Sequence, residues 1–193
     1  MEKISLNGSW RMKRAGDDEW LPASVPGSVY SDLLTAHKME DPYWRDNETA
    51  ALPLMEHEYT YERNFNVSPV MLGADRLLLR CEGLDTVCAL FINGVLIGQA
   101  YNMHRVWEFD VGGFVSAGEN TLRIVFHSPT RYIKEKQAEC QVAGVAESMT
   151  GFAHIRKAHC MFGWDWGPRL PDAGIWRDIS LVSINGGVSA AFI

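Results

Sequence analysis

Residues that suit carbohydrate binding are concentrated near the carboxyl end of the chain. Three of the seven tryptophans fall between residues 164 and 176, and Asp165 lies between the first two, Trp164 and Trp166. Aromatic faces pack against the C–H faces of a pyranose ring, and a carboxylate accepts charge-assisted hydrogen bonds from its hydroxyls. We therefore interpret Trp164, Asp165 and Trp166 as a substrate-binding group. The alternative is that the indoles are core residues and Asp165 caps a turn.

The backbone around this group determines whether its three side chains can meet one ligand. In an extended strand, Trp164 and Trp166 share one face and Asp165 points to the other. Gly163 and Gly167, with the prolines and glycines that follow, predict a loop rather than a helix or a regular ladder. Either the loop is kinked and all three side chains converge, or Asp165 reaches the ligand while the indoles pack behind it.

The composition indicates a soluble globular protein and disfavours two classes of partner. The 193 residues carry a net charge of −6 without any block of Lys or Arg, which argues against nucleic acid. No apolar run is long enough to cross a membrane. The chain opens without an apolar leader, so we expect a cytoplasmic protein with free thiols. The cysteines are Cys81, Cys88, Cys140 and Cys160.

No cofactor or metal site is expected. His154, His159 and Cys160 lack the second ligand pair at a suitable spacing that a zinc site requires, so we assign them to packing. Arg156 and Lys157 are expected to be solvated or ion-paired at the surface.

Alternating apolar residues predict an antiparallel two-sheet β-sandwich. Asn93-Gly94 predicts a hairpin turn, because both central positions of a type I′ turn need positive φ. Short helices are expected at 28–37, capped by Ser28, and at 130–138. Trp176 precedes the last strand, and we expect it in the core. The expected strands are 6–13 (with its leading turn), 58–67, 76–81, 87–92, 95–97, 104–111, 121–126 and 178–183.

The chain is expected to form one domain over residues 1–185, with 186–193 starting a linker to a following module. Inside this domain, segments 41–48 and 140–153 are polar or rich in small residues and irregular. We expect them to be long loops, which is where functional residues tend to lie.

Several motifs together resemble the N-terminal domain of glycoside hydrolase family 2, and most closely its β-mannosidase branch. The most specific is Phe162-Gly-Trp-Asp-Trp-Gly-Pro168 with Ala173-Gly-Ile-Trp176 downstream. Weaker pieces extend the resemblance over nearly the whole chain. They are Leu6-Asn-Gly-Ser-Trp10, Val25-Pro-Gly27, Asp41-Pro-Tyr43 with Asn47-Glu48, Gly83-Leu-Asp-Thr-Val87, Ile92-Asn-Gly94, Asn102-Met103, Gly118-Glu-Asn120 and Ile155-Arg-Lys157.

The resemblance implies a jelly-roll sandwich similar to galactose-binding domains, followed by an immunoglobulin-like module and a TIM barrel. In that family the barrel carries both catalytic glutamates and hydrolyses terminal, non-reducing β-D-mannose residues with retention. Asp165 would accept hydrogen bonds from the β-mannoside, with Trp164 and Trp166 as the apolar wall. This chain alone would hold no catalytic residue and be inactive. Asn47-Glu48 resembles the acid/base pair of such barrels but lies in an early loop, so we interpret Glu48 as a loop residue.

Three alternatives stay open at this point. Instead of a sugar-contacting domain of a β-mannosidase, the chain could be a free-standing carbohydrate-binding module or a domain of a β-galactosidase or β-glucuronidase relative. The third alternative is a purely architectural support for a barrel. An isolated domain of this kind would expose an aromatic, barrel-facing surface. We therefore expect the 193-residue chain to self-associate.

Overall fold

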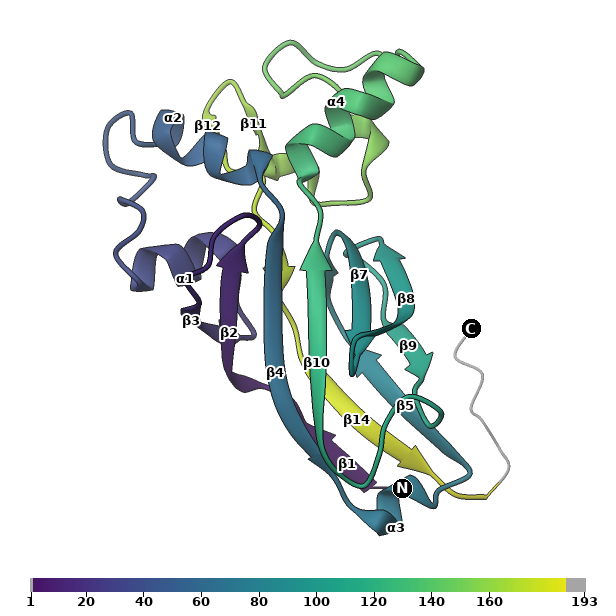
Figure 1. The fold of residues 1–193 in the computed structure, drawn as a ribbon. Coiled ribbons are helices and arrows are strands. Elements are labelled where there is room, and N and C mark those ends of the chain that lie inside the picture. Colours follow the sequence, from purple (N-terminus) through teal and green to yellow (C-terminus); the bar gives the residue numbers. More distant parts are fainter. Residues whose placement is uncertain (1, 187–193) are drawn as a thin grey trace.

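A computed structural model describes residues 2–186 of the chain. Within them the chain forms two antiparallel β-sheets packed as a sandwich, which confirms the expected fold class (Figure 1). Apart from Gly186, the segment 186–193 that the sequence assigns to a linker lies outside the described residues.

The larger sheet has six strands in the order β3-β2-β4-β10-β7-β8. Tyr59, Tyr61 and Phe65 of β4 are buried, as the alternation predicts. The turn at Asn93-Gly94 is confirmed, with φ angles of 52° and 82°. The strands are β2 (Gly8–Arg14), β3 (Leu21–Val25), β4 (Tyr59–Val67), β7 (Val87–Ile92), β8 (Val95–Tyr101) and β10 (Gly118–Phe126).

The smaller sheet has four strands in the order β1-β14-β5-β9, and its edge strand β1 was not expected from the sequence. Two short ladders, β6–β13 and β11–β12, lie outside both sheets. The bounds are β1 (Glu2–Ser5), β5 (Arg76–Cys81), β6 (Leu84–Asp85), β9 (Trp107–Asp110), β11 (Phe162–Trp164), β12 (Gly167–Arg169), β13 (Gly174–Ile175) and β14 (Ile179–Ile184).

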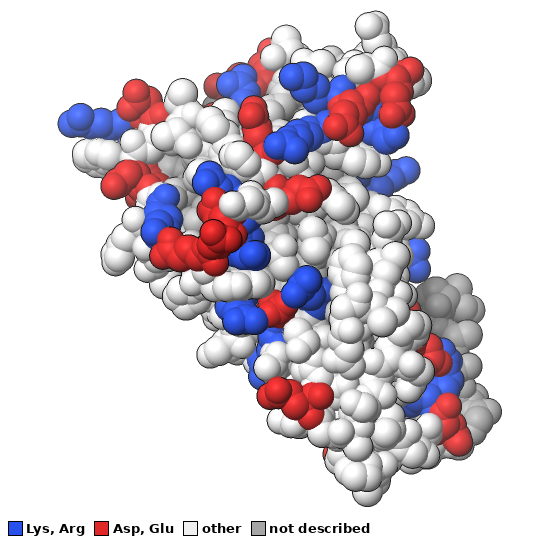
Figure 2. Space-filling view, in the orientation of Figure 1, with Lys and Arg blue, Asp and Glu red and all other residues white. Residues whose placement is uncertain are grey.

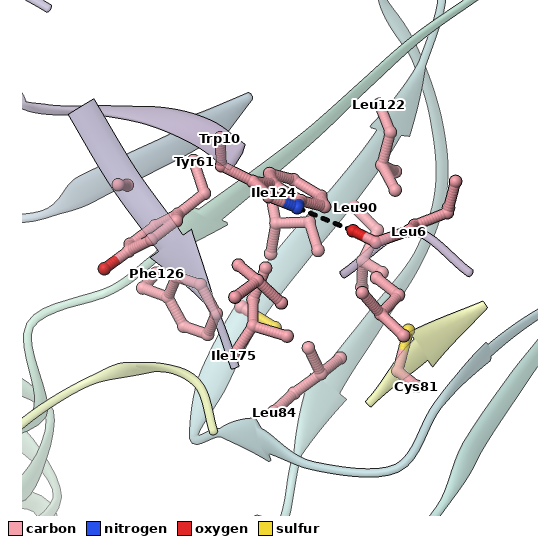
Figure 3. Packing of buried hydrophobic residues seen from close by; sticks show 14 of the residues in the cluster. Leu6, Trp10, Tyr61, Cys81, Leu84, Leu90, Leu122, Ile124, Phe126 and Ile175 are labelled. Atoms are coloured by element: carbon pink, nitrogen blue, oxygen red, sulfur yellow. Dashed lines mark hydrogen bonds between the residues drawn. The ribbon is translucent and has the colours of Figure 1, made fainter. Parts of the chain in front are cut away.

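The two sheets enclose a large apolar core between them. Tyr61 and Phe126 pack edge to face, with ring centroids 5.7 Å apart. The indole N–H of Trp10 donates a 2.8 Å hydrogen bond to the carbonyl of Leu6 (Figure 3). Because this polar group is paired inside the core, Trp10 contributes its apolar area without leaving a donor unsatisfied.

Two of the helices, α2 and α4, lie at one end of the sandwich (Figure 1). Figure 1 places α2, α4 and the β11–β12 hairpin together at the end opposite the N-terminus and α3. Both expected helices are present, with Ser28 and Ser128 as their N-caps. No helix within residues 2–186 is both long and apolar enough to span a membrane. The helices are α1 (Val29–Thr35), α2 (Glu48–Ala51), α3 (Pro69–Leu72), α4 (Pro129–Glu139) and the 3₁₀ turns η1 (Leu52–Glu56), η2 (Phe152–His154) and η3 (His159–Met161).

Ion pairs lie on the outer face of the larger sheet. Figure 2 shows acidic and basic side chains interspersed on the face it presents. Glu62 is buried between Arg11 and Arg123 of the two neighbouring strands. Burial raises the pKa of Glu62, but hydrogen bonds from Arg11 and Arg123 outweigh it and the pKa is lowered. The carboxylate therefore cross-links three strands.

A buried lysine joins three segments beneath the hairpin, and it corrects the expectation for this position. Arg156 is exposed, as expected, but Lys157 is fully buried. Ile155, two residues earlier, is buried as well. Its ammonium contacts the carboxylate of Asp85 and donates a 2.7 Å hydrogen bond to the carbonyl of Asp172. A buried charge without such partners is strongly unfavourable.

We predict that Lys157→Ala lowers the free energy of unfolding by about 3–5 kcal/mol, because it leaves the Asp85 carboxylate buried and unpaired. Urea titration of the 193-residue chain, followed by tryptophan fluorescence, measures the change. Lys136→Ala is the control: its pair with Glu139 is exposed, so the expected loss is below about 0.5 kcal/mol. A loss below about 1 kcal/mol for Lys157→Ala contradicts the role of this pair.

Candidate functional site

The tryptophan-rich stretch forms a short β-hairpin, which we call the tryptophan hairpin (residues 162–169). Phe162 pairs with Arg169 and Trp164 with Gly167, so Asp165 and Trp166 form the turn. The expectation that the glycines exclude a regular ladder is therefore wrong. Gly163 has φ of +93°, and a Cβ there would lie 2.6 Å from Cγ of Arg169. Glycine thus permits the ladder rather than breaking it.

The turn projects all three predicted residues toward solvent. Trp166 is 84% exposed and Trp164 is 46% exposed, and Asp165 is also exposed. Large aromatic side chains are mostly buried in folded domains, so this exposure is unusual. The alternative that these two indoles are core residues does not hold.

Two cavities lie on either side of the hairpin. The polar cavity, about 580 Å³, is lined by Asp165, Trp164 and Trp166 together with Tyr43, Arg45, Glu48, Glu147 and Arg169. The apolar cleft, about 590 Å³, shares both indoles but not Asp165, and extends past Leu34, Phe152 and Met161 to Asp172. All three predicted residues therefore border one cavity, and the indoles also separate it from the apolar cleft. That all three side chains meet one ligand stays a prediction.

The segment before the hairpin fixes its first strand. The hydroxyl of Ser148 donates a 2.7 Å hydrogen bond to the carbonyl of Gly163, and the amide of Met149 donates one of 2.9 Å to the carbonyl of Phe162. Ser148 is buried. The end of the 140–153 loop thus supports β11 through one backbone and one side-chain hydrogen bond, which the sequence did not indicate.

Asp172 holds α1 against the segment that follows the hairpin, and sequence analysis missed it. Its Oδ1 accepts hydrogen bonds from the amides of Tyr30 (3.0 Å) and Ala173 (2.8 Å). Burial raises the pKa of Asp172 to about 6, against the lowering effect of hydrogen bonds from Ser28 and from the same two amides. Its only sequence signal was a carboxylate after Pro171 at the end of an irregular stretch.

Trp176 and His159 pack against neighbouring residues, and Cys160 is exposed. Trp176, expected in the core, is only half-buried: its indole packs against Gly83, and the guanidinium carbon of Arg177 lies 4.0 Å from its ring centroid. His159 packs edge to face on Phe152 at 4.9 Å between ring centroids. Among residues 2–186, no group of three His, Cys, Asp or Glu side chains is placed to hold a metal ion.

The antiparallel sandwich, with its loops and hairpin gathered at one end, defines a galactose-binding-like β-sandwich domain. A family model described as "Glycosyl hydrolase 2 galactose-binding domain-like" matches residues 10–177. The chain belongs to this family.

Curated relatives are β-mannosidases. The β-mannosidase of Capra hircus is 34% identical over 190 residues, which cover 94% of this chain and 22% of that protein. The β-mannosidase of Mus musculus is 34% identical over 194 residues, covering 94% of this chain and 21% of that protein. The chain thus spans about a fifth of the length of these relatives.

Solved structures of glycoside hydrolases superpose on this chain. The β-D-mannosidase from Dictyoglomus thermophilum superposes with a TM-score of 0.92 at 34% identity, covering 96% of this chain and 23% of that one. An exo-chitosanase from Amycolatopsis orientalis superposes with a TM-score of 0.69 at 16% identity, covering 96% and 21%, and this likeness concerns the fold alone.

We predict that Asp172 makes the folded state less stable as pH rises. Its pKa is higher in the folded chain than in the unfolded one, so its favourable contribution is complete below about pH 4 and is lost as pH rises through about 6. Asp172→Asn keeps an acceptor for the two amides but cannot ionise. As pH rises from 4 to 7, the free energy of unfolding of Asp172→Asn should therefore increase relative to that of the unsubstituted chain by roughly 1–3 kcal/mol.

Denaturant titrations of both proteins across this pH range measure that difference. Asp178→Asn, at an exposed carboxylate, serves as the control. A difference between Asp172→Asn and the parent that stays constant with pH contradicts the raised pKa.

Proposed function

We propose that this chain is the N-terminal, non-catalytic domain of a retaining β-mannosidase, and that the tryptophan hairpin forms part of the rim of its sugar pocket. The observation that carries the proposal is the exposed Trp164-Asp165-Trp166 turn at the edge of the polar cavity. Its support is the 34% identity to β-mannosidases over 94% of the chain.

The chemistry of the turn suits recognition of a terminal β-mannoside. Asp165 accepts hydrogen bonds from sugar hydroxyls, and a carboxylate strengthens them through its charge. Trp164 and Trp166 provide apolar walls for the C–H face of the ring. Hydrolysis with retention needs two carboxyl groups about 5–5.5 Å apart. In this proposal a catalytic TIM barrel of the same polypeptide provides both, and this domain contributes binding.

The proposed compartment is the cytoplasm. Cys81 and Cys88 are buried, Cys140 and Cys160 are exposed, and all four are free thiols. Burial raises the pKa of the Cys81 and Cys88 thiols, which keeps them protonated and unreactive. Exposed thiols such as Cys140 and Cys160 persist most easily in a reducing compartment.

We predict that Asp165→Ala in the complete polypeptide lowers kcat for a β-mannoside about 10²-fold, because it removes a charge-assisted hydrogen bond that strengthens in the transition state. Asp165→Asn retains an acceptor without the charge, so its kcat should lie between those of the parent and of Asp165→Ala. Steady-state kinetics on an aryl β-mannoside provide the measurement. A loss below about threefold for Asp165→Ala removes the substrate role and leaves the architectural alternative.

The 193-residue chain alone should show no hydrolysis and little or no affinity for mannose, since it holds only half of the proposed site. Titration with mannose by calorimetry separates this proposal from a free-standing carbohydrate-binding module. Saturable binding with one sugar per chain supports the module instead.

We also predict that the isolated chain self-associates. Tyr43, Trp44 and Trp166 are 77%, 62% and 84% exposed, and Tyr43 and Trp166 line the same cavity. An aromatic surface of this kind favours contact with another apolar surface. Light scattering at increasing concentration should show dimers or larger species, and Trp166→Ser should reduce them. A monomer at every concentration contradicts the prediction.

A further inference from the structure

We propose that Glu48 is a positioning residue that holds the tryptophan hairpin in the geometry needed for Asp165 to meet the sugar. This inference rests on the proposed function of the hairpin. It assigns Glu48 no contact with substrate and no proton transfer. The sequence interpretation of Glu48 as an ordinary loop residue leaves this contact out.

The side chain of Glu48, at the start of α2, bonds the second strand of the hairpin. Its Oε1 accepts a 2.8 Å hydrogen bond from the backbone amide of Arg169. The two residues are 121 positions apart in the sequence. A hydrogen bond from a backbone amide to a carboxylate is charge-assisted, and is stronger than one to a neutral acceptor.

This bond completes the support of a hairpin that would otherwise be weak. An isolated two-stranded hairpin is at best marginally stable in water. Ser148 and Met149 bond carbonyls of β11, on one edge of the hairpin. Glu48 bonds an amide of β12, on the other edge. Residues outside the hairpin therefore form hydrogen bonds to both of its strands, and so hold the turn between them in place.

Arg169 transmits the position of β12 to the turn. Its side-chain stem lies so close over Gly163 that a Cβ at that residue would be 2.6 Å from Cγ of Arg169. Its guanidinium also donates a 3.3 Å hydrogen bond to the carbonyl of Glu147. A shift of Arg169 therefore displaces Gly163, and with it the adjoining Trp164 and Asp165.

Glu48 is itself attached to the rigid body of the domain. It begins α2, which continues directly into η1. The hydroxyl of Tyr30 donates a 3.0 Å hydrogen bond to the carbonyl of Ala51, and the hydroxyls of Ser128 and Thr130 donate to the carbonyl of Met55, with 2.5 and 2.9 Å. These bonds attach the segment that carries Glu48 to α1 and to the start of α4. The Glu48 carboxylate therefore has a fixed position relative to the body of the domain.

The test compares Glu48→Ala with Glu48→Gln in the complete polypeptide, with an aryl β-mannoside as substrate. Misplacement of a binding group by about 1 Å can cost up to 10²-fold in rate. We expect Glu48→Ala to lower kcat about tenfold, and Glu48→Gln, whose amide oxygen still accepts the bond, to stay within about threefold of the parent. Glu56→Ala, at an exposed carboxylate on the adjoining η1, is the matched control and should leave kcat unchanged.

A double-substitution cycle separates positioning from loss of stability. If Glu48 acts through Asp165, adding Glu48→Ala to Asp165→Ala should change kcat by less than about twofold, because the group to be positioned is absent. A full additional tenfold loss overturns the proposal, as does equal damage by Glu48→Gln and Glu48→Ala.

Hydrogen exchange on the 193-residue chain tests the same bond without catalysis. Amides of residues 162–170 should exchange faster in Glu48→Ala than in the parent or in Glu56→Ala. Unchanged exchange there overturns the inference. If Asp165→Ala alone leaves kcat unchanged, the proposed function fails first; if Asp165→Ala is damaging and Glu48→Ala is not, only the inference about Glu48 fails.

Discussion

The end of the sandwich that carries the candidate site depends on one buried ammonium. Lys157 contacts the carboxylate of Asp85 at the edge of the core and the carbonyl of Asp172 beyond the hairpin. Asp172 in turn binds the amide of Tyr30 at the start of α1. Three segments that are remote in the sequence are thereby fixed relative to one another by polar contacts in a dry environment. Such contacts are strong only when every partner is present, so they define one arrangement and penalise others.

The site is built where regular structure ends. The two sheets bury their apolar faces against each other and leave α1, α2, the end of the 140–153 loop and the tryptophan hairpin to meet at one end (Figure 1). Exposed aromatic side chains, which favour contact with another apolar surface, are held there on a short hairpin supported by residues outside it. In the proposed function, this support keeps the exposed group in a fixed position, which precise recognition requires.

The sequence predicted the parts of this protein that depend on neighbours in the chain. The alternation of Tyr59, Tyr61 and Phe65 predicted the strand β4, Asn93-Gly94 predicted a turn of positive φ, and Ser28 predicted a helix cap. The Trp164-Asp165-Trp166 group was chosen from residue types alone. The structure shows that all three residues are exposed, and their substrate role stays a prediction.

Contacts between remote residues were not predictable. Lys157 contacts Asp85, which lies 72 positions away in the sequence, and Glu48 contacts Arg169, 121 positions away. No local sequence pattern therefore predicts either contact. Lys157 was expected at the surface because lysines are mostly solvated, whereas here a buried carboxylate and a carbonyl replace water. The hairpin was missed for a different reason. Glycine weakens a strand by propensity, yet at Gly163 only its missing side chain lets Arg169 cross the ladder.

The most direct test of the central claim is a crystal structure of the complete polypeptide with a mannose-configured inhibitor bound at the catalytic carboxylates. The account predicts that an oxygen of Asp165 lies within hydrogen-bonding distance, about 2.5–3.0 Å, of a hydroxyl of the terminal sugar. It also predicts that Trp164 or Trp166 borders that sugar. An inhibitor seated in the pocket with no contact to residues 164–166 would contradict the account and leave the hairpin an architectural role.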